Sequence, residues 1–285
     1  MTSIAELQKI ASQVRRDILR MIHHAGSGHP GGSLGCADLL VSLYFSQLKH
    51  QAETFTMDGQ GEDIFFLSNG HLSAAWYSTL ARSGYFPIEE LATFRMINTR
   101  LQGHPSPKDL SNGVRIASGS LGQGLSVAIG AALAKKLNND PNLIFTLMGD
   151  GEIQEGQVWE AAMFASAKKV DNLIGIIDNN GRQIDGNVDD VLPLGNICAK
   201  WEAFGWTVMQ MDGNNIPDIL STLTQARKLS GKGKPIMIVM KTEMGFGVDF
   251  MMGTHHWHGV APNDEQLQRA LMQLEETLGD FNIAS

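Results

Sequence analysis

The feature that most constrains the fold is an alternation, from residue 114 onward, of short apolar runs with segments of helical length. Four runs have the length and composition of buried strands, at 143–148, 173–177, 206–211 and 236–240. Helices are expected near 122–137, 156–169, 195–204 and 216–230. Apolar strands that alternate with helices are typical of a parallel sheet covered by helices on both faces. The sequence therefore predicts an α/β fold.

The N-terminal part adds a helix, a loop and one more strand. Ser3 and Glu6 have the spacing of a capping box, and apolar residues then recur on one face of a helix that should end near Ala25 and Gly26. The breaker-rich segment 27–32 is expected to be a loop, followed by an apolar helix over about 34–48 and a strand at 64–67. We expect a single domain over 1–285, with 261–285 as an amphipathic C-terminal helix and a loose tail.

The composition narrows the class of function. The chain is 43% hydrophobic, carries a formal charge of -8 and has no run of Lys or Arg, so neither nucleic acid nor an anionic membrane is an expected partner. No stretch approaches the roughly 18 apolar residues of a membrane span, and the N-terminus does not resemble a signal peptide. Cys36 and Cys198 form no Cys-x-x-Cys pair, which disfavours a zinc site or a disulfide. We expect a soluble, cytoplasmic protein that acts on small molecules.

Two polar side chains are expected to meet at one edge of the sheet. Asp150 directly follows one predicted strand and Asn180 follows the next, with one helix between them. A right-handed crossover would bring both carboxyl ends to the same edge, where ligands bind in open α/β sheets. A carboxylate and an amide oxygen suit magnesium or calcium, and Gly149 and Gly151 would let the backbone approach a phosphate. An ordinary turn is the alternative, because Gly-Asp-Gly alone is common in loops.

The segment 143–186 resembles the cofactor-binding motif of thiamine-diphosphate enzymes, in the form found in transketolases. Gly-Asp-Gly-Glu-Ile-Gln-Glu-Gly is followed about thirty residues later by Asn-Asn and then by Ile-Asp-Gly. The resemblance implies a thiamine-diphosphate-binding fold of the diphosphate (PP) type, with thiamine diphosphate and Mg²⁺ (or Ca²⁺) as cofactors. The implied metal ligands are Asp150, Asn180 and the backbone carbonyl of Arg182.

The same resemblance implies further contacts with the cofactor. The glycine-rich segment 118–124 is similar to the family's Thr-Gly-Pro-Leu-Gly-Gln-Gly, with Ser120 in place of the proline. Tight packing of a helix on the sheet is the alternative for these glycines, and their spacing is not that of a nicotinamide-binding motif. For Glu155 the alternative is an exposed acid in the first turn of a helix. The implied cofactor-binding residues are His71, Gly119, Leu121, Gly151, Glu155, Glu160, Asn180, Ile184 and His258, and the two glutamates also resemble residues near a contact between subunits.

Four histidines lie in loops that contain glycine or proline and match transketolase motifs in the same order. They are His29 in SGHPGG, His71 in SNGHLS, His104 in QGHPSP and His258 in THHWHG. The resemblance implies that His29 and His258 assist proton transfer near the thiazolium carbon, that His71 contacts the diphosphate and that His104 holds hydroxyls of the ketose donor. Imidazole suits these roles because it donates and accepts protons near neutral pH. No role is assigned to His255 or His256.

The resemblance also implies a partner. Nothing after residue 260 resembles the pyrimidine-binding domain or the C-terminal domain of transketolases, which carry the essential glutamate and the arginines that bind sugar phosphates. We therefore expect a separate C-terminal transketolase subunit, in an α2β2 assembly, and sugar phosphate substrates. The expected reaction transfers a two-carbon ketol unit from a ketose phosphate to an aldose phosphate.

Two alternatives to this reaction stay open. One is a split transketolase-like enzyme for a modified sugar, for example a sulfonated or branched one; a relative of 1-deoxy-xylulose-phosphate synthase is disfavoured by Gln154-Glu155 and His258-Gly259. The other is a scaffold subunit without catalysis. A scaffold is expected to lose metal-binding or histidine groups. This chain keeps all six of these residues, namely Asp150, Asn180, His29, His71, His104 and His258.

Overall fold

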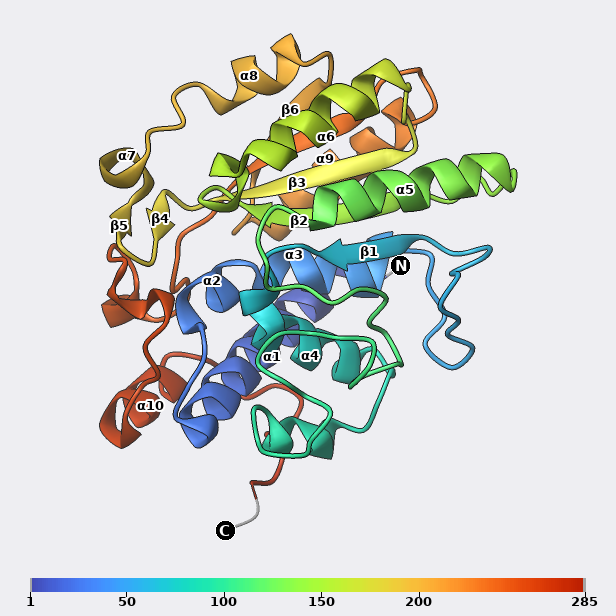
Figure 1. Ribbon diagram of the computed structural model, residues 1–285. Coiled ribbons are helices and arrows are strands. Elements are labelled where there is room, and N and C mark those ends of the chain that lie inside the picture. The colour runs from blue at the N-terminus through green and yellow to red at the C-terminus, as the bar shows by residue number, and fades with distance from the viewer. Residues whose placement is uncertain (1, 284–285) are drawn as a thin grey trace.

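Five parallel strands form the central sheet of the computed structural model, which describes residues 2–283 (Figure 1). In spatial order the strands are β1 (Ile64–Leu67), β2 (Ile144–Gly149), β3 (Leu173–Asn179), β7 (Ile236–Lys241) and β6 (Thr207–Asp212). Every neighbouring pair is parallel. The predicted α/β fold is confirmed, and the predicted strands coincide with these five apart from small shifts at their ends.

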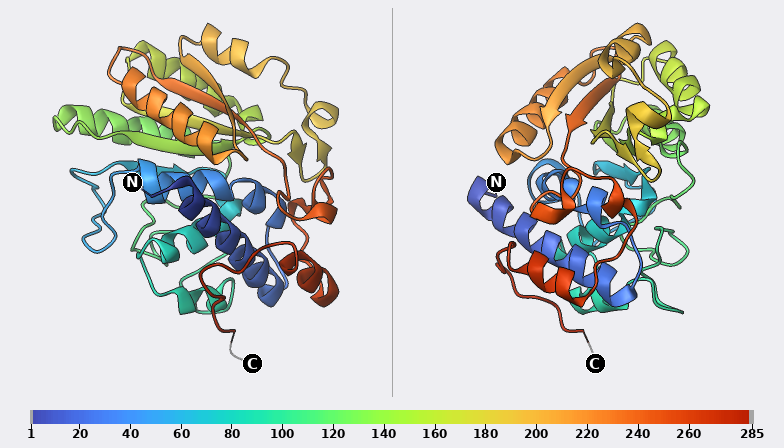
Figure 2. Two further views of the ribbon diagram at one scale, coloured as in Figure 1. Left: turned by 180° about the vertical axis from the view of Figure 1, so that it is seen from behind. Right: turned by 90° about the vertical axis from the view of Figure 1, so that its left-hand side faces the viewer.

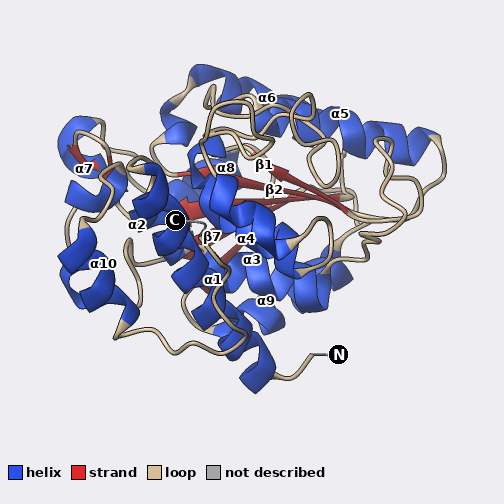
Figure 3. Cartoon of the chain, turned by 90° about the horizontal axis from the view of Figure 1, so that it is seen from below, coloured by secondary structure: helices blue, strands red, loops and turns tan. Residues whose placement is uncertain are grey.

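Helices cover both faces of the sheet, as Figure 3 shows from below. One face packs against α1 (Ile4–Ala25), α3 (Ala37–Ser42), α4 (Ser73–Arg82) and α9 (Ile216–Leu229), and the other against α5 (Gly124–Leu137), α6 (Gly156–Ala167) and α8 (Ile197–Ala203). Successive strand residues point to opposite cores, so that Phe65 joins the first and Phe66 the second. Between residues 2 and 283, no helix combines the length and the apolar character that crossing a membrane requires.

The predicted apolar helix over 34–48 is wrong in its start and its continuity. The chain instead forms α2 (Pro30–Gly35), then α3, then a π-helical turn over Leu43–Gln47. Pro30 begins α2 because the first helical position needs no backbone N–H. A Cβ on Gly35 would lie 2.9 Å from the carbonyl oxygen of Glu243, so glycine lets α2 approach that loop. The consequence is that His29 lies directly before a helix rather than inside a long loop.

A small hairpin and several short helices were not predicted. The hairpin pairs β4 (Arg182–Gln183) with β5 (Gly186–Asn187) and leads into α7 (Val188–Val191). The 3-10 helices are Gly70–Leu72, Ile88–Thr93, Glu152–Gln154, Asp249–Met251 and His256–His258. Strands of two residues are too short to give an alternating pattern. In Figure 1 the hairpin, α2 and α7 gather on the left, beyond the carboxyl ends of the strands.

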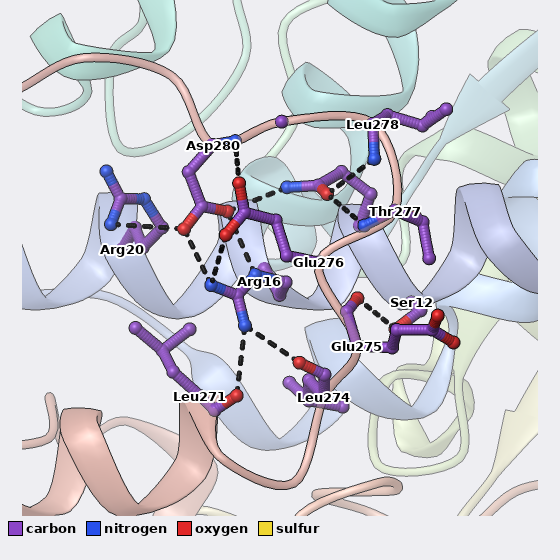
Figure 4. A network of polar contacts seen from close by, with 12 residues as sticks. Ser12, Arg16, Arg20, Leu271, Leu274, Glu275, Glu276, Thr277, Leu278 and Asp280 are labelled. Atoms are coloured by element: carbon purple, nitrogen blue, oxygen red, sulfur yellow. Dashed lines mark hydrogen bonds and ion pairs between the residues drawn. The ribbon is translucent and has the colours of Figure 1, made fainter.

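The C-terminal segment begins with α10 (Asp264–Leu271) and continues as a chain that runs beside α1 (Figure 2). We call residues 272–283 the C-terminal strap. Arg16 donates two hydrogen bonds to Asp280, at 2.9 and 2.7 Å, and two more to the carbonyl oxygens of Leu271 and Leu274 (Figure 4). Phe281 is buried in the core. The expectation of a loose tail was therefore wrong.

Candidate active site

The loops that follow β1, β2 and β3 line a cavity of about 380 Å³ at the carboxyl edge of the sheet. Most of the predicted site residues line it, namely His29, His71, His104, Gly119, Leu121, Asp150, Gly151, Asn180, Arg182, Ile184 and His258. The structure does not bring Glu155 and Glu160 into this lining. Glu155 precedes α6, Glu160 lies within it, and both are exposed. An exposed acid at a helix start is the alternative that the sequence left open for Glu155.

Asp150 is a buried carboxylate whose partners are backbone amides. One of its oxygens accepts a hydrogen bond from the N–H of Gly151 at 2.8 Å, and the other from that of Gly181 at 2.6 Å. Burial, with a further contribution from the nearby carboxylate of Asp178, raises the pKa of Asp150 to about 7 in the protein without ligands. A cation bound in this position would favour the ionised form of the Asp150 carboxylate.

Asn180 is held beside Asp150 by its neighbours. Its amide nitrogen donates to Asp178 at 2.9 Å, and its side-chain oxygen accepts from the N–H of Arg182 at 2.9 Å. Asp178 in turn accepts a hydrogen bond from the hydroxyl of Thr242 on the loop after β7. The parallel register of β2 and β3 therefore brings together the carboxylate and the amide that the sequence placed at one edge.

The four loop histidines converge over the same cavity although they come from distant parts of the chain. The ring centre of His29 lies 5.2 Å from that of His71, 6.4 Å from that of His104 and 5.7 Å from that of His258. His71 and His258 are separated by 5.3 Å. Gly119 lets the glycine-rich loop approach this group, because a Cβ there would lie 2.7 Å from the His104 ring.

Burial keeps these histidines neutral. It lowers the pKa of His29 to about 4 and that of His71 to about 3, and the neighbouring imidazoles add to the effect. Burial also lowers the pKa values of His104 and His258. At neutral pH each ring therefore offers one nitrogen as donor and one as acceptor. A cluster of this kind can bind hydroxyl groups and exchange protons with them.

Sequence reasoning missed two polar residues around the cavity. Asn69 lines it, is almost fully buried, and has no hydrogen-bond partner for either atom of its amide among residues 2–283. Asn69 lies two residues after the end of β1, at the same edge of the sheet as Asp150 after β2, and this signal could have identified it. Glu152 also lines the cavity and is buried beside Asp150. Its partners are a serine and backbone amides, for which the sequence has no clear signal.

The residues at the edge fit the predicted metal and diphosphate. No group of three or more His, Cys, Asp or Glu side chains suited to a metal occurs within the described part of the chain. A metal here would depend on one carboxylate and on neutral oxygens, and hard oxygen donors of this kind suit Mg²⁺ bound together with phosphate. The unpartnered amide of Asn69 and the unpartnered Nδ1 of His29 are buried polar groups that a polar ligand would satisfy.

Comparisons with known proteins show the family of this chain. The model of the family "Transketolase, thiamine diphosphate binding domain" matches residues 7–282. The chain is 40% identical to a 6-deoxy-6-sulfo-D-fructose transketolase subunit from Clostridium sp. (strain MSTE9), over 95% of this chain and 97% of that protein. It is 36% identical to one of the subunits of an apulose-4-phosphate transketolase from Actinobacillus succinogenes, over 96% and 98% of the two chains.

Longer transketolases share the fold. The transketolase structure from Campylobacter jejuni superposes with a TM-score of 0.89 at 36% identity, covering 99% of this chain and 45% of that one. Transketolase 1 of Escherichia coli is 33% identical over 98% of this chain and 43% of its own length. The chain thus spans less than half the length of these two proteins.

The fold and the cavity define the class: an α/β protein with a polar cavity at the carboxyl edge of its sheet. Within that class, the chain belongs to the transketolase family and corresponds to its thiamine-diphosphate-binding domain. The resemblance found in the sequence is confirmed.

Proposed function

We propose that this chain holds the diphosphate and metal end of thiamine diphosphate in a two-subunit transketolase, which transfers a two-carbon ketol unit from a ketose phosphate to an aldose phosphate. The observation that carries the proposal is a cavity lined by the buried Asp150, the half-buried Asn180 and four converging histidines. Mg²⁺, or Ca²⁺ in its place, would be held by Asp150, Asn180 and the carbonyl of Arg182. Gly119, Leu121, Gly151 and Ile184 would line the cofactor.

When bound, thiamine diphosphate supplies the carbanion chemistry through its ylid, and the protein supplies orientation and proton transfer. His71 would contact the diphosphate. His29 and His258 would exchange protons with hydroxyl groups of the substrate, and His104 would hold further hydroxyls of the donor. Burial keeps these imidazoles neutral at pH 7, so that each ring can both donate a hydrogen bond to a substrate hydroxyl and accept one from it.

The proposed partner is a separate subunit with the pyrimidine-binding and C-terminal domains, in an α2β2 assembly. Two relatives that align along nearly their entire length are named as transketolase subunits. The outer surfaces of α5 and α6 also support a partner, because they expose Val127, Met163 and Phe164 on helices whose opposite sides face the core. Helices that are apolar on all sides are normally buried. Glu155 directly before α6 and Glu160 within it are also exposed, so both are accessible to a partner.

The test is to assay ketol transfer for this chain alone, for the partner alone, and for the mixture, with Mg²⁺ and thiamine diphosphate. We expect activity only in the mixture, and the Asp150→Ala variant should abolish it while still assembling. Full turnover by this chain alone would refute the requirement for a partner. A mixture that works unchanged with Asp150→Ala would indicate a scaffold subunit instead.

A modified sugar is the second candidate substrate. The similarity to subunits named for a sulfonated sugar and for apulose 4-phosphate favours it. A panel of ordinary and modified ketose donors with the matched partner would decide between them. If kcat/KM for a sulfonated or branched donor exceeds that for every ordinary ketose phosphate by about tenfold or more, the modified sugar is the preferred substrate.

A further inference from the structure

Glu152 is a buried acid that connects three separate segments around the cavity. It lies in the short helix after β2, and its side chain is nearly inaccessible to solvent. One carboxylate oxygen accepts hydrogen bonds from the hydroxyl of Ser68 and from the N–H of Gly122, the latter at 2.8 Å. The other oxygen accepts from the N–H of Gly149 at 3.0 Å. Ser68 also accepts a hydrogen bond from the N–H of Gly124, at 3.0 Å.

Each of these partners adjoins a part of the cavity. Ser68 is the first residue after β1 and precedes Asn69, and Gly149 ends β2 and precedes Asp150. Gly122 belongs to the glycine-rich loop, which contributes Gly119 and Leu121 to the lining. The carboxylate of Glu152 is therefore the common acceptor that fixes the glycine-rich loop against the ends of two neighbouring strands.

The donors that face Glu152 explain why this position needs a carboxylate. Both backbone amides are fixed donors, and the Ser68 hydroxyl already accepts from Gly124 and so has its proton free to donate. A glutamine of the same shape would turn an NH₂ group toward one of these donors and leave that donor unpaired. Leaving a buried donor unpaired costs about 1–3 kcal/mol. An apolar residue would leave all of them unpaired.

We propose that Glu152 is a positioning residue for the cofactor site: it holds the 118–124 loop against β1 and β2, so that the loop is in place before a ligand binds. The positioning role of Glu152 rests on the proposed function in one respect, namely that the ligand is thiamine diphosphate. Glu152 itself is not a metal ligand or a proton donor in this account. A ligand that meets a loop already fixed does not bear the entropic cost of ordering it.

The experiment compares wild type with Glu152→Gln and Ser68→Ala in the two-subunit enzyme and in the chain alone. In the mixture we expect Glu152→Gln to raise the KM for thiamine diphosphate about tenfold at saturating Mg²⁺ while kcat at saturating cofactor changes less than about threefold. In the chain without cofactor, amide hydrogen exchange within 118–124 should accelerate about tenfold or more. Ser68→Ala should shift both quantities in the same direction by a smaller factor.

Asp280→Asn is the matched control, because it weakens a buried hydrogen-bond network far from the cavity. It should lower the melting temperature without accelerating exchange within 118–124 or raising the KM for the cofactor. Unchanged exchange in both Glu152→Gln and Ser68→Ala would overturn the proposal, and if Glu152→Gln does not fold, Ser68→Ala alone decides. A wild-type chain that binds no thiamine diphosphate even in the mixture would refute the proposed function, while the exchange measurement would still test the loop.

Discussion

The cofactor cavity and the C-terminal strap both contain polar groups shielded from solvent, but the cavity leaves some of its groups without partners, whereas Arg16 and Asp280 at the strap bond each other within the chain. In the cavity both atoms of the Asn69 amide lack partners, and Asp150 has only backbone amides to offset its burial. In the strap, Asp280 accepts from Arg16 and from Gln13 at 2.8 Å. The hydrogen bonds from these residues outweigh burial and lower the pKa of Asp280.

The difference separates groups kept for binding from groups kept for stability. A buried polar group without a partner destabilises the folded chain by about 1–3 kcal/mol, whereas a satisfied group stabilises it modestly. Substitutions of the unpartnered polar groups in the cavity should therefore weaken ligand binding at little cost in stability. Substitutions of Asp280 in the strap should lower stability and leave ligand binding unchanged.

The largest effect is expected for Asp150→Ala. Loss of a carboxylate at the metal position should weaken binding of thiamine diphosphate with Mg²⁺ by at least about 100-fold in the two-subunit enzyme. The melting temperature of the chain without cofactor should stay the same or rise, because a buried carboxylate without a cationic partner is removed. Calorimetric titration and thermal unfolding measure the two quantities. A large drop in stability with intact binding would reverse our assignment of this residue.

The second effect is expected for Asp280→Ala. This change leaves the guanidinium of Arg16, whose side chain is only 9% exposed, with only the longer ion pair to Glu276 at 3.5 Å, so the free energy of unfolding should fall by about 2 kcal/mol. Cofactor binding should be unchanged. Asp264→Ala provides a matched control, because Asp264 also bonds a basic side chain, His23, but its own side chain is 97% exposed and should matter much less. Equal losses in the two variants would contradict the account of the strap.

The third effect is a loss of about tenfold in affinity for thiamine diphosphate, which we expect for Asn69→Ala. The buried amide has no partner within the described chain, so its removal should leave the melting temperature nearly unchanged or slightly higher. Cofactor affinity should fall if the amide binds the ligand. Unaltered affinity in this variant would show that Asn69 is not part of the binding site.

The smallest effect is a change in how the stability of the chain depends on pH, which we expect for His71→Asn. Unfolded histidine takes up a proton near pH 6.5, whereas folded His71 does so only near pH 3. The stability due to neutral His71 is thus fully present above pH 6.5 and is lost as the pH falls toward 3. Relative to wild type, His71→Asn should therefore gain stability between pH 7 and pH 5. The raised pKa of Asp150 makes the folded state more stable as the pH falls, but this contribution is common to wild type and His71→Asn. Denaturant unfolding at each pH, with exposed His255→Asn as control, tests this sign.

Much of the fold could be predicted because its strands are short, uninterrupted apolar runs flanked by polar turns. The start of α2 could not be predicted, because Pro30 is compatible with either a loop or a first helical turn. The strap was missed for a different reason. Asp280 is held by Arg16, more than 260 residues earlier in the chain, and no local pattern records such a contact.

The site was predictable to the extent that it follows strand ends. The geometry of parallel strands predicted that Asp150 and Asn180 lie at one edge of the sheet, and in the structure both line the same cavity there. The convergence of the histidines followed only from the family resemblance, because their loops have no common periodicity. Glu152 was missed because its role depends on the backbone amide of Gly122 and the hydroxyl of Ser68, which lie 30 and 84 residues earlier in the chain.

The central claim is that the sheet edge binds the metal and the diphosphate of thiamine diphosphate. The most direct test is an anomalous difference map from crystals of the two-subunit enzyme grown with thiamine diphosphate and Mn²⁺ in place of Mg²⁺. We predict a single strong peak per chain within coordination distance, about 2.1 Å, of the Asp150 carboxylate, the Asn180 side-chain oxygen and the Arg182 carbonyl. A peak at other residues, or bound cofactor with no peak at Asp150, would contradict the account.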